Sequence, residues 1–485
     1  MVAIGVMLRC YTPSPLWLDE SITVSIARLP LSHLQDALKV DGAPPLYYVL
    51  LHGWLRLFGA SAIGARSLSG LLGIATLPLV WLAGRREAGP SGGRTALLLL
   101  ASSPFAVYYS TEARMYSLVL FLVTVGYLLL RRALEEPTVG RLLALPFVAA
   151  ALALTHYWSL FLLVVIVTML SFRAWRGPDR RAALRCAGAV AAGALLFLPW
   201  LPTFLFQAAH TGTPWAQPAQ YSAIAAAVSE WAGGGSNQGR VLGLIFIALA
   251  GAGLLGRRLD ARRMIIDLSP PPVTAALATV FVGTLALALS AGLVSGSGFA
   301  ARYTIVAFLP FLLLLVHGLE ALPTAATRPV LTLAVIAGLS TALVNPTNTH
   351  KTDANLVAAA IRAGFHSGDV VAYCPDQLGP AVSRLLDSSL PQLVYPTGGP
   401  PQRVDWVDYE RRNVASRPSE FAALLAAHHP RTIWYVEATD YRTFEGKCEQ
   451  VDALLTTGHR RRVLVSTNRS YFEHPALIRY DGGPR

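Results

Sequence analysis

The chain has 485 residues, of which 53% are hydrophobic and only 14% are charged. A soluble protein normally has about 25% charged residues, so this composition excludes an ordinary soluble enzyme and indicates a polytopic membrane protein. The formal net charge of +12 comes mostly from arginines in short loops between apolar segments. This distribution is typical of membrane orientation rather than of nucleic-acid binding, and we expect no nucleic-acid partner.

Apolar segments long enough to cross a bilayer fill most of the chain before residue 345. Together with a short apolar N-terminal segment, they predict about eleven spans. This first segment ends before Trp17 and is shorter than a full span, so we expect either an incomplete first helix or a short re-entrant stub. The longer segments are 64–84, 95–111, 115–130, 141–155, 158–172, 186–205, 241–256, 273–294, 303–319 and 329–345.

Arginine-rich loops alternate with arginine-poor loops along this region. The positive-inside rule places the arginine-rich loops in the cytoplasm, so the first long loop, residues 10–63, faces outward. We therefore expect a multi-pass protein of the cell inner (plasma) membrane. The loops assigned to the cytoplasm contain Arg85 and Arg86, Arg131 and Arg132, the five arginines between 173 and 185, and the four between 257 and 263.

The first outer loop is predicted to contain two amphipathic helices, at 20–38 and 44–58. In the second helix the apolar residues recur at helical spacing, and Pro44 and Pro45 suit its first turn. Such helices would lie flat on the outer leaflet and hold the acids of the loop against the membrane. We assign residues 1–345, including this loop, to one transmembrane domain.

Residues 346–485 are richer in charged residues and predict a small α/β domain with a mainly parallel sheet. The span count places this domain outside the cytoplasm. Cys374 and Cys448 both fall in it and could either form a disulfide or remain two buried thiols. No cysteine has metal-ligand spacing and there is no phosphate loop, so no metal or nucleotide site is expected. Strands are predicted at 370–374, 392–395, 432–437 and 463–467, and helices near 353–364, 377–387, 418–428 and 446–457.

Asp19 and Glu20 lie at the outer end of the first apolar segment. Charge beside a bilayer is costly, and where it persists it indicates a functional site. A carboxylate at this place could act as a general base on a hydroxyl group. Helix capping is the alternative, in which Asp19 or Ser21 caps a helix that begins at residue 20.

Two arginines are predicted on the same outer side. Arg114 follows Glu112 at a turn between two spans, and Arg302 precedes Tyr303 at the start of a late span. Arginine is suited to bidentate recognition of phosphate, so the pair could hold a lipid phosphate. The alternatives for either arginine are snorkelling to lipid headgroups or an ion pair with Glu112. The lone His156 nearby is of a kind that is more often structural than catalytic.

Taken in chain order, these segments resemble the polytopic GT-C glycosyltransferases that use polyprenyl-phosphate sugars, specifically the family 39 or dolichyl-phosphate-mannose mannosyltransferase-like group of bacteria. The shared motifs span the whole membrane region in the order of that family. They are Trp17-Leu18-Asp19-Glu20, Pro44-Pro45-Leu46-Tyr47-Tyr48 with Gly59 and Arg66-Ser67, Glu112-Ala113-Arg114-Met115-Tyr116, His156-Tyr157 and Arg302-Tyr303.

The resemblance implies inverting transfer of a sugar from a polyprenyl phosphate to an acceptor hydroxyl on the outer face. The motifs do not specify the sugar, for which we expect mannose first and a pentose next. The acceptor would be a cell-envelope glycan, lipid or protein. The resemblance gives Asp19 the role of base and Glu20 a supporting role, without a metal or other cofactor. The chain departs from similar proteins at Ala43, where a histidine or lysine often precedes the prolines. Arg302, Arg114 and Tyr303 would bind the donor phosphate, and Asp41, Tyr47, Tyr48, Glu112 and His156 are further candidates for substrate contact.

Other functions fit parts of the pattern. A lipid or glycan transporter or flippase would place ionisable groups near the bilayer midplane, often within inverted repeats. Here the notable charges gather at one face and no internal repeat is evident. A polymerase or ligase of lipid-linked glycans would share the outer site, and a non-catalytic sensor with an external domain is a further alternative.

Overall fold

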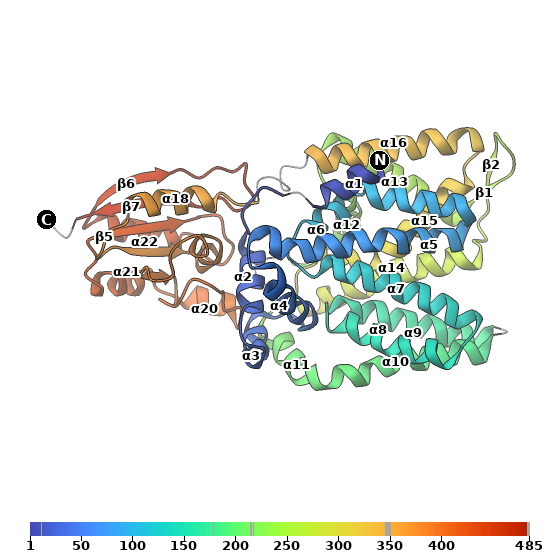
Figure 1. The fold of residues 1–485 in the computed structure, drawn as a ribbon, viewed down its shortest axis with the longest axis horizontal. Coiled ribbons are helices and arrows are strands. Elements are labelled where there is room, and N and C mark those ends of the chain that lie inside the picture. Colours follow the sequence, from blue (N-terminus) through green and yellow to red (C-terminus); the bar gives the residue numbers. More distant parts are fainter. Residues whose placement is uncertain (11, 178, 214–215, 217, 345–350, 483–485) are drawn as a thin grey trace.

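The computed structural model describes the whole chain except residues 11, 178, 214–215, 217, 345–350 and 483–485. A helical bundle and a sheet-containing C-terminal domain lie end to end, and three helices of the first loop lie between them (Figure 1). These are α2 (Leu18–Ala27), α3 (Leu31–Asp41) and α4 (Leu46–Phe58). The predicted polytopic helical fold with a C-terminal α/β domain is confirmed. The boundary predicted at 345–346 lies outside the described residues.

Eight helices of the described chain are long and apolar enough to cross a membrane. One of them, α5 (Ala62–Ser102), leaves helical geometry at Ala88 and Gly89. The chain folds back there, since a Cβ on Gly84 would lie 2.5 Å from the oxygen of Gly92. α5 thus contains the predicted apolar segment 64–84 and the first part of 95–111, which continues into α6 (Pro104–Ser110), and α8 (Val139–Ala153) is a shorter apolar helix. The count of about eleven spans stays a prediction.

The remaining helices of the bundle follow in chain order. A short helix α1 (Val2–Leu8) precedes the first loop, and α6 (Pro104–Ser110) continues α5 after a break. The others are α7 (Tyr116–Glu135), α9 (Trp158–Arg176), α10 (Arg180–Phe197), η1 (Leu198–Trp200), α11 (Leu201–His210), α12 (Ala223–Trp231), α13 (Asn237–Leu255), α14 (Pro272–Ser295), η2 (Ala301–Ala307), α15 (Phe308–Ala321) and α16 (Thr324–Val344).

The first-loop helices differ in part from the prediction. The single helix expected at 20–38 is wrong, because the chain breaks before Pro30 and forms α2 and α3 instead. Proline lacks an amide hydrogen and disfavours helical geometry in the preceding residue, so it ends one helix and begins the next. The second predicted helix is confirmed as α4. α2 does not lie on a surface, since Ile22, Val24 and Ile26 are fully buried between the bundle and the C-terminal domain (Figure 1).

The C-terminal domain has a five-stranded sheet in the order β4-β3-β5-β7-β6. Parallel pairs join β3 (Val370–Cys374) to β4 (Gln392–Val394) and to β5 (Thr432–Glu437). Antiparallel pairs join β7 (Ala476–Asp481) to β5 and to β6 (Arg460–Val465). The prediction of a mainly parallel sheet is therefore wrong, and the sheet is mixed. The cause is β7, an unpredicted strand that enters the sheet between β5 and β6.

The helices of this domain agree with the prediction apart from one addition. α18 (Ala354–Gly364), η3 (Asp376–Leu378) with α19 (Gly379–Ser383), α21 (Pro418–Ala427) and α22 (Lys447–Thr456) match the four expected segments. The short helix α20 (Tyr409–Ala415) was not expected. Of the two alternatives for the cysteines, the structure has the disulfide, which joins Cys374 at the end of β3 to Cys448 in α22.

The arginine-rich loops lie at the end of the bundle remote from the C-terminal domain. A small unpredicted hairpin of β1 (Gly256–Arg258) and β2 (Met264–Ile266) marks that end in Figure 1. The loop between α9 and α10 lies at the same end, whereas the C-terminal domain occupies the opposite end. The basic loops and the C-terminal domain therefore lie at opposite ends of the bundle.

The core of the bundle depends on a close approach of α13 and α15. A Cβ on Gly253 would lie 2.2 Å from the oxygen of Leu314, and one on Gly318 would lie 2.0 Å from the oxygen of Leu249. Small residues let membrane helices approach until their backbones touch. Any side chain at these two glycines would push the helices apart.

Gly253→Val is therefore expected to destabilise the bundle, because the added side chain overlaps the backbone of α15. Gly251→Val is the matched control on the same helix, since a Cβ on Gly251 meets no atom within 4 Å. In detergent, thermal unfolding of the first variant should begin several degrees below that of the control. Equal unfolding temperatures would contradict this account of the contact.

Candidate functional site

Asp19 lies between two arginines that come from distant parts of the chain. Its Oδ2 atom is 3.2 Å from Nη1 of Arg302 and 3.9 Å from Nη2 of Arg114. The Asp19 side chain is 17% exposed, so this cluster is partly open. Thr23, one turn further along α2, donates to the Asp19 carbonyl at 2.7 Å and accepts from Arg114 at 2.8 Å. The helix thus holds both the acid and one of the arginines.

The cluster faces a cavity of about 450 Å³. One part of its wall is polar, and the rest is formed by apolar side chains of α9, α11 and α14, among them Phe161, Phe204 and Ala288. Six of the predicted site residues line this cavity: Asp19, Asp41, Arg114, His156, Arg302 and Tyr303. The other four, Glu20, Tyr47, Tyr48 and Glu112, are not among its lining residues. The described part of the chain has no group of three or more histidine, cysteine or acidic residues that could hold a metal ion.

Glu20 is fully buried and forms an ion pair with Arg66. Its two oxygens accept from Nε and Nη2 of Arg66 at 2.7 and 2.6 Å, and one of them also accepts from the amide of Ala113 at 2.9 Å. Burial alone would raise the pKa of the Glu20 carboxyl, but the charge and hydrogen bonds of Arg66 hold this pKa below its ordinary value. Glu20 thereby ties α2 to α5 and to the turn that carries Arg114.

The capping alternative is resolved by the N-terminus of α2. The residue at the capping position is Trp17, and Glu20 reaches back to its amide at 3.5 Å. Neither Asp19 nor Ser21 caps the helix: Ser21 donates its hydroxyl to the carbonyl of Leu16. Glu20 therefore has the capping contact, and the Asp19 carboxylate points to the arginines.

Tyr47 and Tyr48 support residues of the cavity wall. The hydroxyl of Tyr47 is 2.9 Å from that of Ser69, which donates to the carbonyl of Arg114 at 3.1 Å. The hydroxyl of Tyr48 donates to Asp41 at 2.8 Å. Burial raises the pKa of the Asp41 carboxyl, and the Arg114 charge opposes this shift in part. Both tyrosines thus act through a neighbour rather than at the cavity surface.

Glu112 pairs with Lys351 and not with Arg114. Nζ of Lys351 lies 3.4 Å from Glu112, donates to the carbonyl of Thr111 at 3.3 Å and lies 4.7 Å above the ring of Tyr108. Lys351 is only 1% exposed, and burial lowers the pKa of its amine although Glu112 opposes this shift. Lys351 lies at the start of the C-terminal domain, so these contacts attach that domain to the turn that carries Glu112 and Arg114.

His156 is buried beside the arginines, with its ring centre 5.0 Å from that of Tyr303. Its Nδ1 atom accepts a hydrogen bond from the amide of Trp158 at 3.2 Å, which places the proton of the neutral ring on Nε2. Burial, together with the charges of Arg114 and Arg302, lowers the pKa of His156 to about 3. His156 is therefore neutral at physiological pH and has an N–H group to donate.

Sequence reasoning missed three residues of the site: Thr23, Lys351 and Trp406. Lys351 offered one signal, since lysine occurs only three times among the 40 basic residues of the chain. Trp406 offered none, because it reaches the cavity from a loop of the C-terminal domain. Its amide donates to the carbonyl of Val40 at 3.3 Å and so joins that loop to α3.

Comparisons with known proteins agree with this architecture. Residues 42–205 match the family model described as dolichyl-phosphate-mannose-protein mannosyltransferase. No curated protein matches the chain by sequence.

Solved structures match over almost the whole chain. The structure of ArnT from Cupriavidus metallidurans bound to undecaprenyl phosphate has 12% identity and a TM-score of 0.61, and covers 99% of this chain and 97% of its own. The apo form of the same protein has 13% identity and a TM-score of 0.62, and the match covers 99% of this chain and 96% of that chain. An oligosaccharyltransferase from Archaeoglobus fulgidus, tethered with an acceptor peptide, has 9% identity and a TM-score of 0.53. That match covers 96% of this chain and 72% of the oligosaccharyltransferase chain.

These matches and the long apolar helices define a multi-pass membrane protein with the GT-C fold. Within that fold, residues 42–205 are similar to the dolichyl-phosphate-mannose-protein mannosyltransferase family model. The resemblance of the ordered motifs to GT-C proteins is therefore confirmed. The roles of the individual site residues stay predictions.

Glu20→Gln is expected to destabilise the protein strongly, because it leaves the Arg66 charge buried without its partner. Breaking a buried ion pair typically costs about 3–5 kcal/mol. Glu136→Gln is the control, since Glu136 pairs with Arg141 at the surface with 70% of its side chain exposed, and such pairs contribute about 0–1 kcal/mol. Thermal unfolding in detergent compares the two, and a similar loss in both variants would contradict the structural role of Glu20.

Proposed function

We propose that this protein is an integral membrane glycosyltransferase that transfers a sugar from a polyprenyl-phosphate donor to an acceptor hydroxyl, with inversion. The observation that supports it most directly is the placement of one carboxylate, Asp19, between Arg114 and Arg302 at the wall of a cavity that is also lined by apolar side chains of α9, α11 and α14. The arginines of this wall suit a phosphate, the apolar side chains suit an isoprenoid chain, and the carboxylate can accept a hydrogen bond from a hydroxyl group. The GT-C fold supports this general activity.

Arg302 and Arg114 are proposed to bind the donor phosphate. Both side chains line the cavity, and guanidinium groups recognise phosphate by paired hydrogen bonds. Burial alone would lower the pKa of Arg114, but the negative charge of Asp19 raises it well above its ordinary value, so this arginine keeps its charge. The apolar side chains of α9, α11 and α14 would contact the first isoprene units. Tyr303, which lines the same cavity, would contact the donor beside Arg302.

Asp19 is proposed as the general base. In the transfer step the acceptor oxygen attacks the anomeric carbon of the sugar, the bond from that carbon to the phosphate oxygen breaks, and the acceptor proton passes to Asp19. The leaving polyprenyl phosphate keeps the electron pair, and the two arginines stabilise its charge. A donor phosphate at Arg302 would also replace Asp19 as the partner of that arginine, which would free the carboxylate to accept a proton.

The site is proposed to face the outside of the cell. The arginine-rich loops lie at the opposite end of the bundle, and the positive-inside rule places them in the cytoplasm (Figure 1). The Cys374–Cys448 disulfide fits an oxidising compartment, where such bonds persist. We propose mannose as the sugar because the matching family model describes mannosyltransferases that use a lipid phosphate donor.

Asp19→Asn is expected to lower kcat by at least 100-fold, because the amide cannot accept the hydroxyl proton. The donor KM should change little, since both arginines remain. Asp179→Asn is the matched control, as Asp179 is exposed and pairs with Arg173 in the loop between α9 and α10. Transfer from polyprenyl-phosphate [14C]mannose by purified protein in nanodiscs measures both values. Near-normal turnover by Asp19→Asn would contradict the assignment of the base.

Arg302→Ala is expected to raise the donor KM by about 10- to 100-fold, which corresponds to the loss of one charged hydrogen bond of about 1.5–3 kcal/mol. The binding of undecaprenyl phosphate, without any sugar, should weaken by a similar factor. Arg94→Ala is the control, because Arg94 is an exposed arginine of α5 that does not line the cavity. Unchanged affinity for undecaprenyl phosphate in Arg302→Ala would contradict the role of this arginine.

A further inference from the structure

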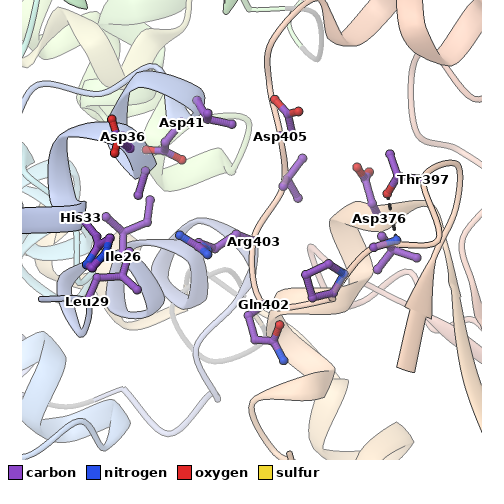
Figure 2. Close-up of a pocket in the computed structure, with 16 residues that line it drawn as sticks. Ile26, Leu29, His33, Asp36, Asp41, Asp376, Thr397, Gln402, Arg403 and Asp405 are labelled. Atoms are coloured by element: carbon purple, nitrogen blue, oxygen red, sulfur yellow. Dashed lines mark hydrogen bonds between the residues drawn. The ribbon is translucent and has the colours of Figure 1, made fainter. Parts of the chain in front are cut away.

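A second open space lies between the first-loop helices and the C-terminal domain. This space, which we name the outer cleft, has a volume of about 580 Å³. Side chains of α2 and α3 form one wall, and residues of the segment 394–405 form most of the other. Figure 2 shows the two walls facing each other, with Asp36 and Asp41 on the first and Arg403 and Asp405 on the second. Nothing assigned so far accounts for this cleft.

The outer cleft adjoins the cavity that Asp19 lines. Along the first wall, Val40 lines the cleft, Asp41 lines both spaces, and the next residues, Gly42 and Ala43, line the cavity. Along the second wall, Asp405 lines the cleft whereas its neighbour Trp406 lines the cavity. The two spaces therefore lie on either side of the hydrogen bond that the amide of Trp406 donates to the carbonyl of Val40 at 3.3 Å. Asp41, the residue after Val40, stands at this boundary.

The titratable side chains of the outer cleft are mostly acids. Four aspartates line it, against one arginine and one histidine. Two of these acids are held by tyrosines: Asp41 accepts from Tyr48 at 2.8 Å, and Asp376 accepts from Tyr409 at 2.5 Å. Asp405 pairs with Arg412, and both Asp405 and Asp36 are exposed to solvent. Carboxylates held in this way can accept hydrogen bonds from hydroxyl groups of a ligand.

This lining differs from that of the cavity. The cavity presents Arg114 and Arg302 and an apolar wall, which suit a phosphate and a lipid chain. The outer cleft presents acids that would repel a phosphate, beside apolar side chains such as Ile26, Val40 and Val404. The cavity has two aspartates and two arginines, whereas the outer cleft has an excess of acids, so the two spaces differ in charge as two different substrates would need.

We propose that the outer cleft binds the acceptor, and that this acceptor is a hydroxyl-rich glycan without phosphate or other anionic groups. This inference rests on the proposed glycosyltransferase activity and adds the chemical class of the second substrate. The sugar chain occupies the cleft, its reacting hydroxyl passes Asp41, and the oxygen meets the donor sugar beside Asp19. Asp41 is a positioning residue that orients this hydroxyl, and Asp36 excludes anionic acceptors at the entrance.

The first test blocks the cleft without touching the cavity. Ala37 lines the outer cleft on α3, whereas Ser32 on the same helix is exposed and does not line it. Native membranes supply the acceptor, and polyprenyl-phosphate [14C]mannose supplies the label. Ala37→Trp should raise the membrane concentration needed for half-maximal transfer at least 10-fold, with the donor KM unchanged, whereas Ser32→Trp should leave both unchanged. Equal acceptor dependence in the two variants would overturn the inference.

The second test addresses the charge of the acceptor. Labelled glycan released from the product of the wild-type protein should pass through an anion-exchange column without retention, before and after phosphatase treatment. Asp36→Lys should weaken acceptor use at least 10-fold with the donor KM unchanged, and Asp179→Lys, on an exposed loop, is the control. A labelled glycan that is retained until phosphatase treatment would overturn the stated acceptor class.

The two proposals fail in different ways. If the wild-type protein neither transfers nor hydrolyses polyprenyl-phosphate mannose, the proposed function is contradicted. If the donor is used and its KM is normal in Ala37→Trp, while acceptor use is also normal, only the assignment of the outer cleft is contradicted. Slow release of mannose to water by Ala37→Trp would show that the donor site is intact while the acceptor is excluded, as the inference requires.

Discussion

The site depends on the buried ion pair between Glu20 and Arg66. Burying two charges costs several kcal/mol each unless hydrogen bonds compensate. Here Arg66 also donates to the carbonyls of Ser14 and Pro15, and Glu20 also accepts from Ala113. The pair therefore joins the start of the first loop, α5 and the turn before Arg114 in one rigid unit. Asp19, next to Glu20 in α2, takes its position from that unit.

The C-terminal domain belongs to the site as much as the bundle does. Lys351 inserts into the bundle and reaches Glu112, while Trp406 closes the cavity wall and joins α3. Because Glu112 and Arg114 share one short turn, the lysine also constrains the arginine that the proposal assigns to the donor. The cavity and the outer cleft thus meet along the junction between bundle and domain. Small movements of the domain would change both spaces together.

Motif order predicted much of this arrangement from the sequence. Asp19, Arg114 and Arg302 were expected on one face. The structure brings a side-chain nitrogen of each arginine within 4 Å of the Asp19 carboxylate. Glu20 was expected to support its neighbour, but its partner Arg66 was known only as part of a motif. Lys351 and Trp406 were missed because neither belongs to one of the ordered motifs, and their contacts depend on how the C-terminal domain packs on the bundle. The mixed sheet was missed because β7 enters between strands that precede it in the chain.

The most direct measurement is a cryo-EM structure of the protein with undecaprenyl phosphate in nanodiscs. We expect phosphate density within hydrogen-bond distance of Arg302 or Arg114, beside Asp19, with the isoprenoid chain along α9 and α14. We also expect the Asp19–Arg302 contact to lengthen, because the phosphate takes the place of the carboxylate. Phosphate density at the arginine-rich end of the bundle, with the cavity unoccupied, would contradict the account.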